Sequence, residues 1–380
     1  MDVFIRDVVK SKLGYNIIMK DEQVVAVKAI LEGKDIFVVL PTGYGKSLCY
    51  MVLPFLFDAI LSEKGSIIII VTPLTAIIKD QVSACQEKGI SCGYICGEND
   101  DKTMTAGVEN CKYQLIYFTP EMLLLNKRWR KLLISAAYQT KIKGLALDEA
   151  HTIKKWGSTF RESLAKIGEL RSLLPGKTPI MALTATADYT LRTELQYIIG
   201  MKSPLSVVLP PCKPNITYKI HEYISLQSNF MHIVEVGAPS LSKYKLVEMF
   251  TSCTDEAIKK QIIISFTKGD TLCIVCATIA FGMGVDCPNV WVVMHVGPSD
   301  DIESYIQETG RGGRDGLPCE AILLNKKSSL RYANNAMREY ANNSSECRRH
   351  LLFRRLEGYD KEKHNVPKKY CCDFRFVCFV

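Results

Sequence analysis

The sequence has no hydrophobic run long enough to cross a lipid bilayer. Its strand-like apolar run Ile67–Val71 is five residues long, whereas a membrane-spanning helix needs about 20. The first seven residues, MDVFIRD, also lack the basic-then-apolar order of a secretory signal peptide. These absences predict a protein with no membrane span and no secretory leader.

Charge of one sign is only in modest excess. The 48 Lys and Arg residues against 40 Asp and Glu leave a net charge of +8, which permits a polyanionic partner without requiring one. With 47% hydrophobic and 23% charged residues, the composition is that of a folded globular protein and excludes a disordered chain. A chain of 380 residues has room for two domains, each with its own core.

Cysteine, by contrast, is abundant, with 15 residues. These residues are scattered through apolar segments, a distribution that indicates a reducing compartment rather than a disulfide framework. We interpret most of them as small core residues, and only the C-terminal group suggests a metal site. We therefore expect an intracellular protein.

The most informative stretch is the heptapeptide PTGYGKS at Pro41–Ser47. It follows the apolar run Ile36–Leu40, which is typical of a buried parallel strand, and it precedes an apolar segment suited to a helix start. Strand, glycine loop, Lys-Ser and helix are the context of a phosphate-binding loop. The strict pattern has a small residue where Leu40 stands, so a chance Gly-Lys-Ser in a strand–turn–helix stays open as the alternative.

The residues of this loop suit the chemistry of a nucleoside triphosphate. Gly43 and Gly45 allow consecutive backbone N–H groups to face one anion. Lys46 can reach the β and γ phosphates, Ser47 can ligate Mg²⁺, and the following helix adds a partial positive charge at its N-terminus. We therefore expect a nucleotide and Mg²⁺ to bind here.

Four further apolar runs alternate with helical patterns, and polar or turn residues follow each run. They are Ile67–Val71, Gln114–Phe118, Ile142–Leu147 and Pro179–Leu183. Short apolar strands alternating with helices predict a doubly wound parallel sheet, whose strands end at one ligand-binding edge. Asp148 and Glu149 follow the third run, where Asp148 could hold Mg²⁺ and Glu149 could deprotonate an attacking water. The alternative is a pair of surface acids.

Taken in order, the motifs of the first half resemble those of superfamily 2 helicases and, among them, the RecQ family. They are PTGYGKS at 41–47, TPL at 72–74 with KDQV at 79–82, TPE at 119–121, DEAH at 148–151 and TAT at 184–186. The resemblance implies an α/β fold of two tandem RecA-like P-loop domains, with parallel sheets flanked by helices, and a short helical C-terminal region. It places the ATP-binding domain at 1–210, a second RecA-like domain at 211–328 and a partial zinc-binding region at 329–380.

The resemblance also implies that the nucleotide is ATP. Lys20–Gln23 resembles the adenine-recognition motif of RecQ helicases, in which Gln23 would bind the adenine and Lys20 stands where arginine is usual. The implied nucleotide contacts are Lys20, Gln23, Thr42, Gly43, Gly45, Lys46, Ser47, Asp148, Gly284 and Asp286. Among these, Ser47 and Asp148 would ligate Mg²⁺.

A second implied set of residues binds DNA. Trp156, Phe160 and Arg161 resemble the aromatic-rich loop that couples single-stranded DNA binding to ATP hydrolysis in this family. Aromatic rings stack on bases, and an arginine can bind a phosphate or a ring. The alternative is that the two aromatic residues belong to the core.

The decapeptide QETGRGGRDG at Gln307–Gly316 resembles the RecQ arginine-finger motif. The resemblance implies that Arg311 and Arg314 stabilise charge on the transferred phosphoryl group and that Gln307 lies near the γ-phosphate. Gly312 stands where the family usually has alanine. The alternative for this decapeptide is a surface loop. The implied catalytic residues are Lys46, Asp148, Glu149, Gln307, Arg311 and Arg314.

The middle of the second half departs from the family pattern. Between Ile220 and Lys245 the sequence has no clear counterpart of the strand–helix–strand that carries motif IV. We expect the helical pattern to resume at Val247–Phe250 and to continue to Phe266. The second domain is thus expected to be shortened, and a parallel sheet without a central strand would expose its edges.

The basic tail contains a cysteine group. Cys347 precedes two arginines, as a zinc ligand of RecQ helicases does, and Cys371, Cys372 and Cys378 supply three further thiols. The spacing from Cys372 to Cys378 is longer than in the family, so His364 is a second candidate for the fourth ligand. The alternative is a set of unpaired cysteines without a metal.

As a whole, the resemblance implies an ATP-dependent 3′–5′ DNA helicase, which couples ATP hydrolysis to movement along single-stranded DNA and to duplex unwinding. The implied partner is single-stranded, forked or partially duplex DNA, the cofactors are ATP and Mg²⁺ with Zn²⁺ as an option, and the implied location is the nucleus. Two alternatives stay open: a nucleic-acid-binding protein that does not unwind DNA, and an RNA-directed superfamily 2 ATPase.

Overall fold

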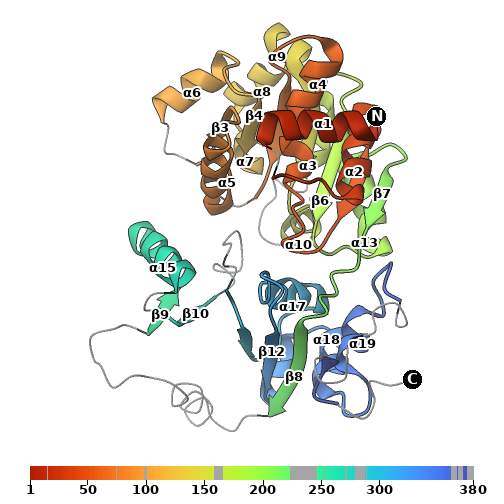
Figure 1. Cartoon of the computed structure of the whole chain (residues 1–380), viewed down its shortest axis with the longest axis vertical. Coiled ribbons are helices and arrows are strands. Elements are labelled where there is room, and N and C mark those ends of the chain that lie inside the picture. Colours follow the sequence, from red (N-terminus) through yellow and green to blue (C-terminus); the bar gives the residue numbers. More distant parts are fainter. Residues whose placement is uncertain are drawn as a thin grey trace. The chain divides into compact units, whose positions relative to one another are not determined.

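The computed structural model divides the chain into two compact units (Figure 1). Unit 1 comprises Met1–Leu40 and Tyr44–Leu209, and unit 2 comprises Pro41–Gly43 and Pro210–Val380. The structure describes residues 1–14, 16–73, 75–97, 101–157, 166–222, 246–251, 253–269, 272–278, 287, 289–360, 366 and 371–374.

Unit 1 is built on a seven-stranded parallel sheet in the order β3-β4-β2-β5-β6-β1-β7. Its strands are β1 Ile36–Val39, β2 Ile67–Val71, β3 Cys92–Ile95, β4 Leu115–Phe118, β5 Ile142–Leu147, β6 Ile180–Thr184 and β7 Leu205–Val208. Every residue of β1, β2, β4 and β6 is buried. Continuous runs of buried Ile, Val and Leu are expected where helices cover both faces of a parallel sheet.

Two cores, one on each face, hold this sheet between its helices. Because successive side chains of a strand point to opposite faces, Ile68 and Ile70 join the core under α1 to α5, while Ile67 and Ile69 join the core under α6 to α13. The first group of helices is α1 Asp2–Leu13, α2 Asp21–Leu31, α3 Leu48–Met51, α4 Leu53–Leu61 and α5 Thr75–Glu87. The second group is α6 Lys102–Glu109, α7 Pro120–Leu124, α8 Lys127–Leu133, α9 Ala136–Lys141, α10 Thr152–Gly157, α12 Leu170–Leu173 after the 3-10 turn Ile167–Glu169, and α13 Tyr189–Ile199.

The predicted parallel α/β sheet of the first half is confirmed. The five predicted strands correspond to β1, β2, β4, β5 and β6. The sequence did not indicate β3 or β7, which form the two edges of the sheet. Their residues are less uniformly apolar, and the first two residues of β7 are exposed. No helix in the described part of the chain is long and apolar enough to cross a membrane.

The described strands of unit 2 form two separate parallel sheets, one in the order β11-β12-β8 and one pairing β10 with β9. The strands are β8 Ile216–Glu222, β9 Val247–Phe250, β10 Ile274–Ala277, β11 Val292–Val296 and β12 Cys319–Asn325. The helices are α15 Glu256–Lys268, α17 Ile302–Thr309, α18 Asn335–Asn342 and α19 Arg348–Phe353, with a 3-10 helix at Lys327–Tyr332. Strand β11 leaves Val292 and Val296 half-exposed.

One prediction for this unit is wrong. Val247–Phe250 is a strand paired with β10, not the start of a helix, because alternate side chains of this short segment suit a half-covered sheet. The helix begins only at Glu256, where the side chain of Asp255 caps it by accepting from the Ala257 backbone N–H at 2.8 Å. The interval expected to lack motif IV lies mostly outside the described residues, which omit 223–245.

A buried aspartate ties several segments of unit 1 together. Asp35 precedes β1 and is 4% exposed. Its Oδ1 accepts from the Ile180 backbone N–H at 2.9 Å, and its Oδ2 accepts from the Lys202 backbone N–H at 2.7 Å and forms an ion pair with Arg171. One carboxylate therefore serves two backbone donors and one guanidinium from three different segments.

Replacing Asp35 by Ala should lower the free energy of unfolding by about 3 kcal/mol, because it leaves two backbone amides and the partly buried guanidinium of Arg171 without this acceptor. Urea unfolding of the full chain, followed by circular dichroism, measures this change. Glu109→Ala is the matched control, because Glu109 pairs with Arg128 at the surface, where ion pairs contribute little. Equal effects of the two substitutions would contradict the assigned role of Asp35.

Candidate active site

The phosphate loop joins β1 to α3 and needs two glycines in the left-handed region. Gly43 has φ +78° and Gly45 has φ +88°, values that side chains with a Cβ rarely adopt. A Cβ added to Gly45 would also lie 2.9 Å from Nε2 of Gln23. The loop therefore requires glycine both for its turn and for the close approach of α2.

Gln23, in the first turn of α2, is held against this loop. It is 2% exposed, its Oε1 accepts from the Lys20 backbone N–H at 2.8 Å, and its Nε2 donates to the carbonyls of Tyr44 at 3.1 Å and Gly45 at 3.0 Å. The residue expected to bind adenine thus contacts the backbone of the residues expected to bind phosphate. Sequence spacing alone did not predict this contact.

Tyr44 adds a second connection between the loop and α2. Its hydroxyl donates to the Glu22 carboxylate at 2.6 Å, and Nζ of Lys20 lies 3.6 Å from the centre of its ring. The hydrogen bond from Tyr44 lowers the pKa of Glu22, whereas burial, followed by the hydrogen bond to Glu22, raises the pKa of Tyr44. Lys20 therefore contacts an aromatic ring of the loop.

Asp148 follows β5 and is 7% exposed, with Oδ1 accepting from the Glu149 backbone N–H at 2.9 Å. Burial, and then the negative charge of Glu149, raise the pKa of Asp148, while the positive charge of Lys46 opposes the shift. A nearby cation favours the charged form of such a carboxylate, and oxygen ligands are those that Mg²⁺ prefers. The Asp148 carboxylate and the Ser47 hydroxyl, which precedes α3, are both oxygen donors of the kind that suits Mg²⁺.

Glu149 adopts a rare backbone conformation for a residue with a side chain, with φ +51°. Its Oε2 lies 3.3 Å from Nδ1 of His151, which is also 3.1 Å from Oγ1 of Thr184. Thr184 Oγ1 in turn donates to the Thr186 carbonyl at 3.0 Å. The DEAH and TAT motifs, 33 residues apart between His151 and Thr184, therefore contact each other directly.

In unit 2, two residues hold the arginine-bearing loop that follows α17. Nζ of Lys213 donates to the carbonyl of Gly310 at 2.7 Å and to that of Gly312 at 3.3 Å. Nδ2 of Asn215 donates to the carbonyl of Gly313 at 2.8 Å and, further along, to that of Leu317 at 2.7 Å. Gln307 belongs to α17, and Arg311 and Arg314 lie in the supported loop. This support could not be predicted from sequence patterns, because it joins segments about 100 residues apart.

The glycine that replaces the usual alanine in this loop has a steric reason. A Cβ on Gly312 would lie 2.2 Å from Sγ of Cys319 and 3.2 Å from Cγ2 of Val293. Cys319 is buried at the start of β12, so its sulfur occupies the space that an alanine methyl would need. The departure at position 312 therefore depends on the residue at position 319.

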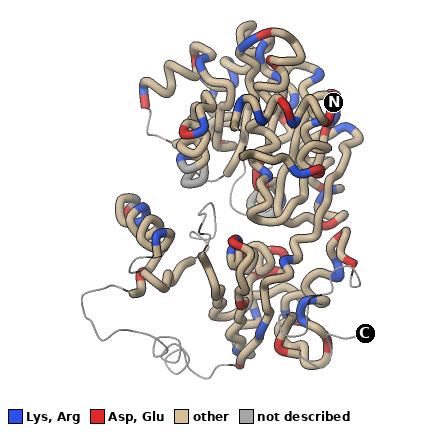
Figure 2. The backbone as a smooth tube through the Cα atoms, in the orientation of Figure 1, with Lys and Arg blue, Asp and Glu red and all other residues tan. Residues whose placement is uncertain are grey.

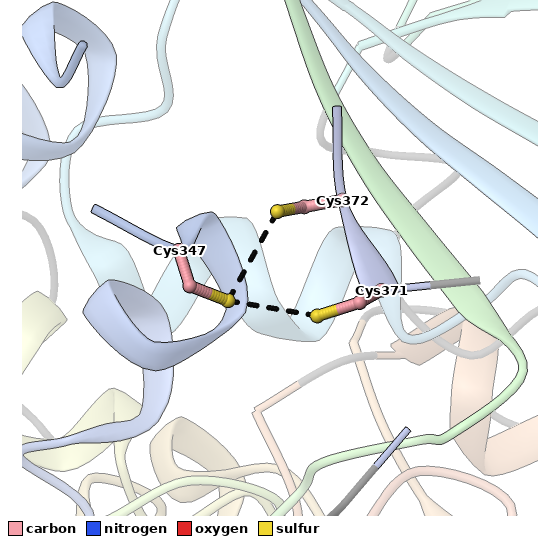
Figure 3. Close-up of side chains that lie close together, drawn as sticks. All are labelled: Cys347, Cys371 and Cys372. Atoms are coloured by element: carbon pink, nitrogen blue, oxygen red, sulfur yellow. Dashed lines mark hydrogen bonds between the residues drawn. The ribbon is translucent and has the colours of Figure 1, made fainter. Parts of the chain in front are cut away.

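Three thiols of the tail point toward one another (Figure 3). Sγ of Cys347, at the N-terminus of α19, lies 3.5 Å from Sγ of Cys371 and 3.9 Å from Sγ of Cys372. A backbone β-bridge joins Cys372 to Tyr218 of β8, and Asp373 forms an ion pair with Arg348 of α19. These two contacts hold the segment 371–374 in place beside α19. Three converging thiols are a donor set that fits Zn²⁺.

The remaining predicted residues are not placed. Phe160, Arg161, Gly284, Asp286 and Cys378 lie outside the described residues, as does the alternative zinc ligand His364. Trp156 belongs to α10, but its side chain is not described. The predicted DNA contacts and the fourth thiol therefore stay predictions.

The chain is similar in sequence to known helicases. Residues 20–193 match the family model described as DEAD/DEAH box helicase, and residues 225–316 match that described as helicase conserved C-terminal domain. The ATP-dependent DNA helicase RecQ of Haemophilus influenzae is 34% identical over 83% of this chain and 52% of that protein. The RecQ-like DNA helicase blm-1 of Caenorhabditis elegans is 28% identical over 96% of this chain and 41% of that protein. The chain thus spans about half the length of the curated relatives that it matches.

Solved helicase structures share its fold. A structure of the DUF1998 helicase MrfA bound to DNA has a TM-score of 0.63 and 19% identity, covering 85% of this chain and 51% of that chain. The DEAD-box helicase Mss116 bound to ssRNA and UDP-BeF has a TM-score of 0.65 and 19% identity, covering 90% of this chain and 78% of that chain. At these identities the likeness establishes the fold alone, and it confirms the predicted tandem RecA-like architecture.

Gly312→Ala should destabilise unit 2, because overpacking a filled site costs about 1–3 kcal/mol. Cys319→Ala removes the obstructing sulfur, so the double variant Gly312→Ala/Cys319→Ala should recover most of that loss. Thermal unfolding of the parent chain, both single variants and the double variant measures the coupling. Strictly additive effects would contradict the steric contact.

Proposed function

Because this chain belongs to the RecQ family of superfamily 2 helicases, we propose that it is an ATP-dependent 3′–5′ DNA helicase. The observation that supports the proposal best is the contact of Gln23 with the phosphate loop, in the same unit as the buried Asp148 carboxylate. In this proposal residues 1–210 bind ATP, 211–328 form the second, shortened RecA-like domain, and 329–380 form a partial zinc-binding region.

The proposed roles in unit 1 follow from the chemistry of each group. Gln23 and Lys20 would bind the base, and the loop N–H groups with Lys46 would bind the phosphates. Ser47 and Asp148 would hold Mg²⁺, which when bound neutralises charge on the phosphates. Glu149, next to Asp148, would orient the attacking water and accept its proton.

The second unit would supply the remaining catalytic groups. Arg311 and Arg314 would stabilise negative charge on the transferred phosphoryl group, with Gln307 near the γ-phosphate. Lys213 and Asn215 hold the loop that carries both arginines, which restricts the positions that the guanidinium groups can take. Pre-positioned charge of this kind needs little rearrangement during the reaction.

The proposed partner is DNA with a single-stranded segment, and the proposed location is the nucleus. Trp156, Phe160 and Arg161 would contact the strand by stacking and by a phosphate or cation–π contact. Figure 2 shows basic and acidic residues interspersed along both units. With a net charge of +8, a diffuse positive excess would support backbone contacts, whose strength falls as salt is added.

A second candidate function is a DNA-binding ATPase that does not separate strands. It is favoured by the division of unit 2 into two parallel sheets within the described residues. Movement along DNA needs both RecA-like domains to act as rigid bodies, so a divided sheet could permit ATP turnover without unwinding. The RNA-directed ATPase stays as a third candidate, because its ATP chemistry is the same.

Single-stranded DNA should stimulate ATP hydrolysis by the purified chain, and Lys46→Ala should lower the stimulated rate about 100-fold or more, because it removes a charge from the phosphate site. Lys64→Ala, which changes an exposed lysine of the same unit, is the control and should leave the rate unchanged. DNA binding without Lys46-dependent hydrolysis would contradict the proposal that the chain hydrolyses ATP at this loop. Stronger stimulation by RNA than by DNA would favour the RNA-directed ATPase. ATP hydrolysis without unwinding of a forked duplex would favour the DNA-binding ATPase that does not separate strands.

We further propose that Cys347, Cys371 and Cys372 bind Zn²⁺, with Cys378 as the fourth ligand. The purified chain should then contain about one zinc ion, and Cys347→Ser should lose it, because a structural zinc site needs all four ligands. Elemental analysis of the desalted protein measures the content. Cys253→Ser, at an exposed cysteine elsewhere in unit 2, is the control. A metal-free parent chain would exclude the zinc site.

A further inference from the structure

A buried hydroxyl and a side-chain amide lie directly behind the proposed magnesium ligand. Oη of Tyr50 is 2.8 Å from Oε1 of Gln81 and 3.1 Å from Oδ2 of Asp148. Nε2 of Gln81 donates to the same Oδ2 at 3.4 Å. The three residues come from α3, α5 and the end of β5, so three separate elements meet at one carboxylate oxygen.

The two carboxylate oxygens of Asp148 therefore have different hydrogen-bond partners. Oδ2 is held by side chains, whereas Oδ1 accepts from the Glu149 backbone N–H at 2.9 Å. An ionised carboxylate has about four lone-pair sites, so Oδ1 keeps acceptor capacity for a cation. Holding Oδ2 fixes the rotation of the carboxylate and thereby the direction in which Oδ1 faces.

Tyr50 is suited to this task because it stays a neutral donor. It is fully buried, and burial, followed by the nearby Tyr117 and Asp148, raises its pKa well above the ordinary value. Tyr50 therefore presents an uncharged hydroxyl to the carboxylate that would hold the ion.

We propose that Tyr50 and Gln81 are positioning residues for Mg²⁺: they orient the Asp148 carboxylate toward the metal of the bound nucleotide. The inference rests on the proposed function, since it assumes that Mg²⁺ and ATP bind at this loop. Residues that hydrogen-bond a metal ligand fix its orientation, and their loss typically lowers metal affinity or activity by about 10- to 100-fold.

The competing explanation is that Asp148 and Gln81 merely satisfy a hydroxyl that the core has buried. Tyr138 provides the matched comparison, because it is equally buried in unit 1 and its hydroxyl donates to the Val108 carbonyl at 2.5 Å. Tyr138 lies in the core on the other face of the sheet from Tyr50. Each substitution removes a buried hydroxyl and its hydrogen bonding, but only the Tyr50 hydroxyl contacts a proposed metal ligand, Asp148.

The test is a binding measurement on the full chain rather than a rate. A fluorescent, non-hydrolysable ATP analogue is held at constant concentration, and Mg²⁺ is titrated while nucleotide binding is followed by anisotropy. Tyr50→Phe should raise the Mg²⁺ concentration for half-maximal binding about tenfold, and Gln81→Ala should raise it in the same direction. Tyr138→Phe should leave it at the parent value.

The outcomes separate this inference from the proposed function. Equal Mg²⁺ midpoints for Tyr50→Phe, Tyr138→Phe and the parent chain would overturn the positioning role while leaving nucleotide binding intact. Gln81→Ala provides an independent test if Tyr50→Phe fails to fold. An unchanged Mg²⁺ midpoint in Gln81→Ala would also overturn the positioning role. A parent chain that binds the analogue with no dependence on Mg²⁺ or on Lys46 would overturn the proposed function, and the inference with it.

Discussion

The parallel pairing of β5, β6 and β1 is the constraint on which the site depends. Leu147 pairs with Ala182, and Val39 pairs with Thr184, so these neighbouring strands end at nearly the same level. The segments that follow them carry the phosphate loop, the DEAH acids and the TAT hydroxyls. Because parallel strands present all their carboxyl ends at one edge, three motifs that are spread over residues 41–186 of the sequence come together without long side chains having to bridge the distance.

This arrangement brings two acidic side chains close together, one of them buried, and a nearby lysine opposes their repulsion. Asp148 and Glu149 repel each other, and burial adds to the cost of ionising Asp148, while Lys46 offsets part of it. Glu149 also adopts a disfavoured φ. Such strain persists only where the surroundings are firmly fixed, and here two packed cores and the Asp35 contacts hold the sheet from both faces. A site with this electrostatic cost is expected to gain stability when a cation binds.

The sequence predicted the parts whose signal is local. The bounds of β2 and β5 agree with the predicted runs because both strands are largely apolar and are followed directly by the polar residues Thr72 and Asp148. The edge strands β3 and β7 are only partly apolar and carry no comparable signal. Val247–Phe250 was misassigned because four residues cannot distinguish a helical period from a strand period. The contacts of Gln23 with the phosphate loop and of Lys213 with the arginine loop arise only in three dimensions, so residue types and spacing could not predict them.

Unit 2 contains two parts that packing supports unequally. The arginine loop lies between α17 and β12, next to a core that extends from Ile216 of β8 to Cys372 of the tail. Among the described residues, the core of β9, β10 and α15 consists of Phe250, Ile262 and Leu272 with a few partly buried neighbours. Since local stability follows buried apolar contact, the arginine loop is expected to stay ordered under conditions in which the smaller part opens. In the proposed function, ATP turnover would use the arginines of the first part, whereas movement along a strand would need both parts to move as one body. The second activity therefore depends more than the first on the packing of the smaller part.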